Sequence, residues 1–314
     1  MRCLVTGGAG FIGSNLIERL VKDGHDVVSI DNYSTGKRNN ERDGCTYISA
    51  DIQDMEFWGR RLEKLKKIPE VVFHLAAKAR VQPSIENPIE FHNANVNGTL
   101  ALLNMCRIYG VKRFVFSSSS SVYGDAEQVP TTEECKLNPM SPYALHKLIG
   151  EQYCKLYSEL YDIETVCLRY FNVYGERQPT EGAYCLVMGV FAQQLLNRQA
   201  MTINGDGEQR RDFTYVGDVV DANIKAGFNS KIPIFKCEGD VFNIGNGDNR
   251  SVNQIADLMG SGYPPNGGDR TFGNPVIEPK ETLADNSKAY KVLGWKPTST
   301  LEDWIPKWKE DLGL

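Results

Sequence analysis

The first thirty-one residues show a change of hydrophobic period that predicts a strand, a turn, a helix and a second strand. Residues 3–6 are apolar or β-branched and two glycines follow at once, which predicts a short buried strand. Apolar pairs then recur with a helical period from Phe11 to Val21, and Gly24 ends this helix. Residues 25–30 predict the next strand, which Asp31 closes.

The same alternation continues to residue 170. Further strands are predicted at 45–49, 71–75, 113–116 and 165–170, and further helices at 54–67, 88–109 and 141–161. Strands that alternate with helices of ten or more residues indicate a parallel sheet covered on both faces. We therefore predict an α/β protein with a doubly wound parallel Rossmann sheet.

Beyond residue 170 the pattern is less regular. A helix near 186–197 and a strand at 201–203 precede strands at 213–216 and 241–244, which flank a helix at 218–228 and could return to the main sheet. Short helices and a Gly/Pro/Asn-rich loop at 260–275 follow. We predict a nucleotide-binding domain from 1–170 plus about 212–245. A smaller, discontinuous α/β substrate domain would comprise 171–211 plus about 246–314.

Gly7, Gly10 and Gly13 stand between the first strand and the first helix. A glycine turn there directs backbone N–H groups, and the positive end of the helix dipole, at a diphosphate. The Asp31 carboxylate at the tip of the second strand would accept hydrogen bonds from an adenine ribose and repel a ribose phosphate. This pattern predicts NAD, although the nearby Lys37 and Arg38 leave NADP open; the alternative is a tight turn without a ligand.

Composition narrows the class of protein. The net charge of −5 over 314 residues favours no nucleic-acid partner, and no apolar run approaches the roughly twenty residues that span a bilayer. The eight cysteines are spread singly, as expected of buried thiols in a reducing compartment. We expect a cytoplasmic protein with no signal peptide, membrane partner or structural metal.

Tyr143 and Lys147 lie four residues apart on the helix that a Ser-Pro pair begins, so they share one face. An ammonium group beside the phenol, together with the charge of an oxidised nicotinamide, would lower the tyrosine pKa from about 10 and make a general base for an alcohol. The serines at 117–121 follow a strand and offer a hydroxyl to the same oxygen, although chemistry alone does not choose among them. The alternative for the pair is ordinary packing.

The chain also carries an ordered set of motifs that resembles the extended short-chain dehydrogenase/reductase family, and most of all its nucleotide-sugar 4-epimerases. The motifs are TGGAGFIG at 6–13, DN at 31–32, NVNGT at 95–99, SSSVYG at 119–124, SPYALHK at 141–147, RYFNVYG at 169–175 and RDF at 211–213.

The resemblance implies a set of site residues. The catalytic group is Ser119, Tyr143 and Lys147. The NAD site comprises Gly7, Gly10, Phe11, Ile12, Gly13, Asp31, Asn32, Ser34, Thr35, Gly36, Asp51, Ile52, Leu75, Ala76, Ala77, Asn95, Ser117, Tyr143, Lys147, Tyr170 and Val173. The UDP-sugar site comprises Ser119, Ser121, Tyr143, Asn172, Leu186, Arg211, Glu278 and Thr282. For Asp51 a helix N-cap is an alternative, and for Arg211 a surface ion pair with Asp212 or Glu208.

The resemblance further implies a reaction. Tyr143 takes the proton from the sugar O4 while the C4 hydride passes to NAD, and the 4-keto sugar turns and takes the hydride back on its other face. NAD then stays bound, and UDP-glucose/UDP-galactose, N-acetylated or uronic forms are the substrate candidates. A homodimer through the helices at 88–109 and 141–161 is also implied.

Two positions depart from the family pattern. A second diphosphate arginine usually stands three residues before an acid, but counting back from Glu278 gives Pro275, which leaves Arg270 as a replacement candidate. Thr282 stands where a bulky side chain is associated with a tight sugar pocket, so its small size hints at larger sugars.

Three other functions remain as alternatives. Nucleotide-sugar 4,6-dehydratases need an acid pair after the catalytic residue, and UDP-glucuronate decarboxylases usually carry a glutamate before Val-Tyr-Gly. Ser120 and Ser121 stand at those positions and are not acids near neutral pH, which favours epimerisation. A catalytically silent NAD-sensing scaffold would not need Ser119, Tyr143 and Lys147 together.

Overall fold

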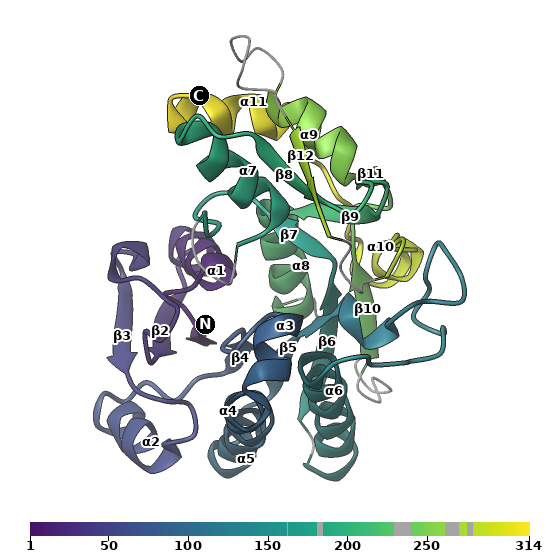
Figure 1. Ribbon diagram of the computed structural model, residues 1–314. Helices are drawn as coiled ribbons and strands as arrows, with labels where there is room; N and C mark the ends of the chain where they lie inside the picture. Colours follow the sequence, from purple (N-terminus) through teal and green to yellow (C-terminus); the bar gives the residue numbers. More distant parts are fainter. Residues whose placement is uncertain (162, 181–184, 229–239, 261–269, 275–278) are drawn as a thin grey trace.

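The computed structural model describes the chain from 1 to 314 except for residues 162, 181–184, 229–239, 261–269 and 275–278 (Figure 1). Within these residues, seven parallel strands form a central sheet in the order β10-β6-β5-β4-β1-β2-β3. The strands are β1 (Arg2–Thr6), β2 (Asp26–Asp31), β3 (Cys45–Ser49), β4 (Val71–His74), β5 (Arg113–Ser119), β6 (Glu164–Tyr170) and β10 (Asp240–Ile244).

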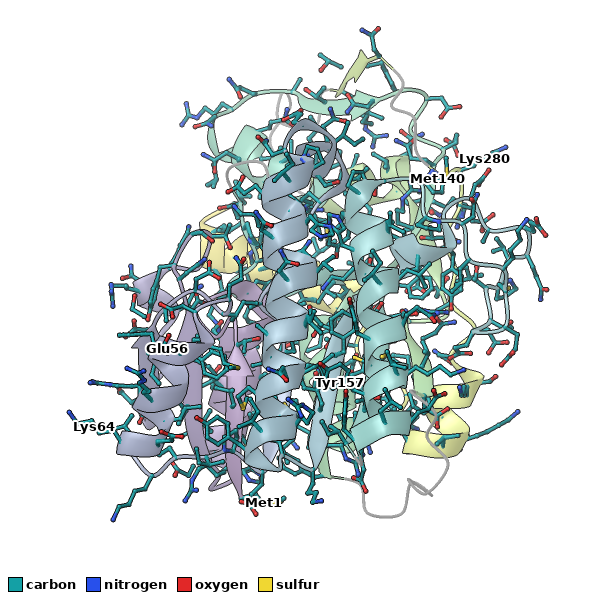
Figure 2. All side chains as sticks on the ribbon, turned by 90° about the horizontal axis from the view of Figure 1, so that it is seen from below. Met1, Glu56, Lys64, Met140, Tyr157 and Lys280 are labelled. Atoms are coloured by element: carbon teal, nitrogen blue, oxygen red, sulfur yellow. The ribbon has the colours of Figure 1, made fainter. Side chains whose placement is uncertain are left out.

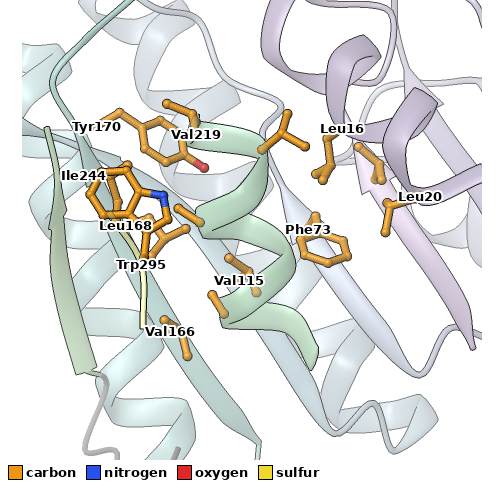
Figure 3. Packing of buried hydrophobic residues seen from close by; sticks show 14 of the residues in the cluster. Leu16, Leu20, Phe73, Val115, Val166, Leu168, Tyr170, Val219, Ile244 and Trp295 are labelled. Atoms are coloured by element: carbon orange, nitrogen blue, oxygen red, sulfur yellow. The ribbon is translucent and has the colours of Figure 1, made fainter. Parts of the chain in front are cut away.

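Helices cover both faces of this sheet. Successive side chains of a strand point to opposite faces, so Cys3 and Val5 of β1 join one buried cluster and Leu4 joins the other. Figure 3 shows the first cluster, where Leu16 packs near Phe73. The helices are α1 (Phe11–Lys22), α8 (Val216–Phe228) and α10 (Ser287–Leu293) on that face, and α2 (Met55–Lys64), α5 (Gly98–Tyr109) and α6 (Pro142–Tyr161) on the other. The predicted doubly wound fold is therefore confirmed.

The helix predicted at 88–109 is divided in the structure. α3 (Val81–Glu86) comes first, and Pro88 then begins α4 (Pro88–His92). A π-helical stretch, η2 (Asn93–Asn97), joins α4 to α5. Such bulges are frequent at functional sites because they redirect side chains. Short 3₁₀ turns also follow β2 and β5, namely η1 (Arg38–Asn40) and η3 (Ser120–Tyr123).

A smaller layer lies beyond the carboxyl ends of the main strands (Figure 1). It contains two small sheets, β11-β9-β7 and β12-β8, and a third apolar cluster with Phe191, Ile255 and Trp304. Its elements are β7 (Asn172–Tyr174), α7 (Val187–Leu196), β8 (Met201–Asn204), β9 (Arg210–Tyr215), β11 (Asn249–Ser251), α9 (Val252–Gly260), β12 (Arg270–Gly273) and α11 (Leu301–Leu312). None of the described helices is both long and apolar enough to cross a membrane.

The prediction that the strands near 213–216 and 241–244 both return to the main sheet was half wrong. β10 pairs with β6, but β9 pairs with β7 and β11 in a separate sheet. The edge beside β6 is taken by β10, and Phe213 of β9 is buried in the third cluster. The boundaries of the two domains stay a prediction.

A buried ion pair ties α6 to the sheet. Arg169 on β6 donates from Nη2 to Glu151 Oε2 at 2.7 Å and from Nε to Oε1 at 2.9 Å, and their side chains are 4% and 3% exposed. The Arg169 guanidinium also donates to the Tyr123 hydroxyl at 2.8 Å, which links η3 to the pair. Removing one partner of such a pair leaves the other charge buried and uncompensated.

We predict that Glu151→Gln lowers the free energy of unfolding by about 3–5 kcal/mol, because Arg169 keeps its charge without a matching carboxylate. Urea denaturation of both proteins measures this difference. The control is Glu159→Gln, whose partner Lys155 is 4.0 Å away and half exposed; its effect should stay within about 0.5 kcal/mol. Equal effects of the two substitutions would contradict the prediction.

Candidate active site

A cleft of about 1660 Å³ runs along the carboxyl ends of the central strands. Its wall includes Gly7 after β1, Asp31 at the end of β2, Leu75 after β4, Ser119 at the end of β5 and Tyr170 at the end of β6. Ligands of open α/β sheets bind at this edge. The predicted site residues that line the cleft are Gly7, Gly10, Phe11, Ile12, Gly13, Asp31, Asn32, Ser34, Thr35, Asp51, Ile52, Leu75, Ala76, Ala77, Ser117, Ser119, Ser121, Tyr143, Lys147, Tyr170, Asn172, Val173, Leu186, Arg211 and Thr282.

The turn after β1 is built on glycines that tolerate no side chain. Gly7 has φ of 73°, and a Cβ atom on it would lie 2.8 Å from the Ala76 nitrogen. A Cβ atom on Gly13 would lie 2.2 Å from the Gly7 carbonyl oxygen. Gly10 precedes α1 without a side-chain cap, so the first N–H groups of the helix face the cleft with no intrahelical acceptor. These groups fit a diphosphate.

Asp31 is held rigidly at the end of β2. The residue is 7% exposed, and its carboxylate accepts hydrogen bonds from the backbone nitrogens of Ala9 at 2.9 Å and Tyr33 at 2.7 Å. A carboxylate can accept further bonds, so ribose hydroxyls fit beside it. Arg38 instead lies over the Tyr33 ring and pairs with Glu41 at 3.2 Å, while Lys37 lines the cleft.

Asp51 also faces the cleft, and its alternative role as a helix N-cap is wrong. Asp54 caps α2 by accepting from the Phe57 nitrogen at 3.2 Å. Asp51 accepts from the Asn32 amide at 3.0 Å, which joins the ends of β2 and β3.

Two residues predicted to touch the cofactor do not line the cleft. Asn95 donates from its amide to the Lys78 carbonyl and accepts from the Lys78 nitrogen, each at 2.8 Å, and so fixes the loop after β4. Gly36 packs against the glycine turn, since a Cβ atom on it would lie 2.9 Å from the Ala9 Cβ. Asn95 and Gly36 therefore support the backbone of segments that line the cleft, and do not line it themselves.

Ser119, Tyr143 and Lys147 come together on one wall. The Tyr143 hydroxyl is hydrogen-bonded to the Ser119 side chain, which also accepts from the Ser121 hydroxyl at 2.9 Å. The Lys147 ammonium donates to the Ser117 carbonyl at 2.7 Å and lies 5.9 Å from the centre of the Tyr143 ring. Ser84 on α3 accepts from the Tyr143 backbone nitrogen at 3.1 Å and anchors the start of α6.

In the protein alone, the pKa of the Tyr143 phenol is raised. Burial raises the pKa of Tyr143 above its usual value, while the hydrogen bond from Ser119 and the charge of Arg80 lower it. Burial also lowers the pKa of Lys147 to about 8, and its ammonium points at the Ser117 carbonyl. Lys147 lies beside the Tyr143 ring, and the expectation that its charge and that of an oxidised nicotinamide together favour the phenolate stays a prediction.

The structure describes some of the residues predicted to bind the UDP-sugar and not others. Asn172 donates to the Asp212 carbonyl at 3.1 Å, and Arg211 donates to the Arg210 carbonyl at 2.8 Å. Glu278 and Pro275 lie outside the described residues. Arg270 pairs with Asp257 on α9 and is not among the described residues that line the cleft; its role as a replacement diphosphate arginine stays a prediction.

The comparison with known proteins decides the family. Residues 3–245 match the model of the NAD dependent epimerase/dehydratase family. The chain belongs to this family. A putative UDP-glucose 4-epimerase of Methanocaldococcus jannaschii is 40% identical over 97% of this chain and 96% of its own length. UDP-glucuronic acid decarboxylase 1 of Xenopus tropicalis is 32% identical over 98% of this chain and 70% of its own length.

Solved structures agree with this assignment. A UDP-glucose 4-epimerase of Thermotoga maritima, crystallised with UDP-glucose, is 36% identical and superposes with a TM-score of 0.88 over 99% of this chain and 100% of that one. A UDP-glucose 4-epimerase of Thermus thermophilus, solved in complex with NAD, is 33% identical and has a TM-score of 0.88 over 100% of this chain and 99% of that one. The predicted resemblance to extended short-chain dehydrogenases and the prediction of NAD as the cofactor are confirmed.

The loop after β4 and the start of α3 contribute cleft residues that were not predicted from the sequence. Lys78, Arg80 and Gln82 line the cleft of this epimerase/dehydratase family member, as does Gln178 after β7. The available signal was topological, because a loop that follows a central strand lies at the ligand-binding edge. The predicted edge ended at Ala77, whereas the chain stays beside the cleft into α3, where Gln82 and Ile85 line it.

Gly13→Ala should weaken NAD binding at least tenfold, since its Cβ atom has no room beside the Gly7 carbonyl and the turn must shift. Calorimetric titration of cofactor-stripped protein with NAD gives the affinities. In the control Gly59→Ala, the added Cβ atom would meet the Tyr109 side chain, whose hydroxyl oxygen is 3.3 Å away, and this variant should bind NAD as the wild type does. Unchanged affinity in Gly13→Ala would refute the role of the turn.

Proposed function

We propose that the protein inverts the configuration at C4 of a UDP-sugar. The observation that carries the proposal is the convergence of Ser119, Tyr143 and Lys147 on one wall of the cleft, which the glycine turn and Asp31 also line. Bound NAD supplies a reversible hydride acceptor and a positive charge.

The protein residues supply the proton chemistry. Tyr143 is the base that takes the proton of the sugar 4-hydroxyl, and Ser119 holds the same oxygen through its hydroxyl. Lys147, protonated below its pKa of about 8, orients the wall through the Ser117 carbonyl. Because burial raises the pKa of the Tyr143 phenol, deprotonation of the phenol depends on nearby positive charge, including that of bound NAD.

The lining supports epimerisation over dehydration or decarboxylation. Among the described residues of the cleft, the carboxylates are Asp31 and Asp51 at the ends of β2 and β3, and Glu90, which pairs with Lys78 at 2.7 Å. The residues next to Ser119 are Ser120 and Ser121, which carry no acid for elimination at C5 and C6. Dehydration and decarboxylation, the second being the reaction in the name of the Xenopus relative, give products that differ from a C4 epimer and can be distinguished by NMR.

Incubation with UDP-sugars and no added cofactor, followed by proton NMR, tests the activity. We expect a C4-inverted product; loss of water or of carbon dioxide would show a sister reaction. Tyr143→Phe should keep NAD affinity within about twofold and lower kcat at least a thousandfold, as loss of a general base does. Full activity in Tyr143→Phe would refute the assigned base, and intact NAD binding without turnover in the wild type would favour an NAD sensor.

We further propose a homodimer through α4–α5 and α6, which run side by side (Figure 2). Their outer faces expose several large apolar side chains, namely Ile89, Ile108, Leu145, Leu156 and Leu160. Exposed apolar area of this kind favours association with a second surface of the same type.

Light scattering at micromolar concentration should give twice the chain mass of 35.1 kDa. Leu156→Glu with Leu160→Glu should give a monomer, because two carboxylates would be buried without partners in the interface. Phe272→Glu, on β12 and 65% exposed, is the matched control and should stay dimeric. A monomeric wild type would contradict the proposal.

A further inference from the structure

The segment 176–179, which begins shortly after β7, joins the small layer to the cofactor helix α1; we call it the strap. On the side of the small layer, the Glu176 carboxylate accepts from the Tyr215 hydroxyl of β9 at 2.9 Å and from the Trp304 indole nitrogen of α11 at 3.0 Å. On the other side, the Glu176 carbonyl accepts from the Asn15 amide of α1 at 2.9 Å. The strap is therefore bonded to both layers.

Arg177 makes the side-chain contacts between the strap and α1. Its guanidinium donates from Nε to the Ser14 hydroxyl at 3.0 Å and from Nη2 to Glu18 Oε2 at 2.7 Å, and Nη2 also donates to the Asn15 side-chain oxygen. The Arg177 side chain is 19% exposed, so water has little access to these bonds. Hydrogen bonds from a charged donor are about twice as strong as neutral ones.

The backbone of the strap forms a tight turn that presents Arg177 to the helix. Arg177 has φ of 68°, in the left-handed region that non-glycine residues rarely adopt. The Gln178 nitrogen donates to the Gly175 carbonyl at 3.2 Å, and the Gln178 side-chain oxygen accepts from the Gly175 nitrogen at 3.4 Å. Such a conformation persists where its surroundings impose it, and it is found most often at functional sites.

The strap also forms part of the cleft wall beside the cofactor turn. Gln178 and Pro179 line the cleft together with Gly10 and Gly13. The acceptors of the Arg177 guanidinium follow this turn directly in the sequence. A dinucleotide whose diphosphate lies at the start of α1 is thus bordered by the strap. Arg177 itself is not among the described residues that line the cleft, so it acts on this wall from behind.

We propose that Arg177 latches the strap to α1 and thereby limits the rates at which NAD enters and leaves the cleft. The inference depends on the NAD site and goes beyond the reaction proposed above. The latch bonds join protein groups to one another, so breaking them raises the open fraction of the strap whether or not NAD is bound. A gate of this kind changes the rates of binding and release together and leaves Kd nearly unchanged.

Stopped-flow fluorescence with NADH measures both rates. Cofactor-stripped protein mixed with NADH gives the association rate, and loaded protein mixed with excess NAD gives the dissociation rate. Arg177→Gln should raise both rates about tenfold and change Kd less than threefold, because the charged donor of the latch is lost. Arg177→Lys should give intermediate rates, since it keeps the charge and loses the fork of donors.

Two further variants complete the experiment, and urea denaturation checks that each is folded. Arg19→Gln is the matched control, because Arg19 stands on the same helix and pairs with Asp23 at its end, at 2.7 Å; both rates should stay within about twofold. Glu18→Gln removes an acceptor that is 55% exposed, so it should raise both rates by a smaller factor than Arg177→Gln. Combining Glu18→Gln with Arg177→Gln should add little, since both break one latch.

Two results would overturn the inference. Rates that are unchanged in folded Arg177→Gln, or in Glu18→Gln should the first variant not fold, would show that the latch does not limit exchange. A faster dissociation with an unchanged association rate would assign Arg177 to cofactor affinity and not to a gate. The experiment requires no turnover, so absence of C4 inversion would refute the proposed function and leave this result as it is.

Discussion

Burial of the Tyr143 phenol is the constraint on which the chemistry of this site depends. Loss of solvent favours the neutral phenol, so its pKa rises, and Tyr143 becomes a base only through its neighbours. The neighbours come from three places in the chain: Ser119 ends β5, Ser84 anchors the backbone of Tyr143, and Arg80 adds positive charge. The cleft thus makes the reactivity of one side chain conditional on what is bound beside it.

The loop between β4 and α3 connects the two ends of the cleft. Near its start the backbone at Ala76 packs against Gly7 of the cofactor turn, and at its end Arg80 lines the cleft. Asn95 pins the loop at Lys78, and the chain of hydrogen bonds from Thr6 through His74 to Thr99 supports it from below. Burial lowers the pKa of His74 to about 3, so its neutral ring can bridge both hydroxyls. This short loop therefore connects the glycine turn of the cofactor site to the end of the cleft that holds Tyr143.

The periodic part of the chain was predictable because each local pattern agreed with the global fold. The glycine turn, Asp31 and the Ser-Pro start of α6 lie where the pattern placed them, since strand, cap and turn signals are properties of neighbouring residues. The predictions that failed concern residues whose partners lie far away in the sequence or compete with a neighbour. The strand at 213–216 joined another sheet because β10 had taken the edge of the main one, and Asp51 was not a helix cap because Asp54 reached the Phe57 nitrogen.

The amino-acid sequence alone determined the order of strands and helices, the parallel sheet, the preference for NAD and the Tyr143–Lys147 pair, because these follow from hydrophobic period and residue spacing. Only the tertiary structure decided what surrounds the phenol. It placed the Ser119 side chain on the Tyr143 hydroxyl, the Lys147 ammonium on the Ser117 carbonyl, and Arg270 beside Asp257. Electrostatic partners depend on distances and burial between segments far apart in the chain, and no local pattern contains that information.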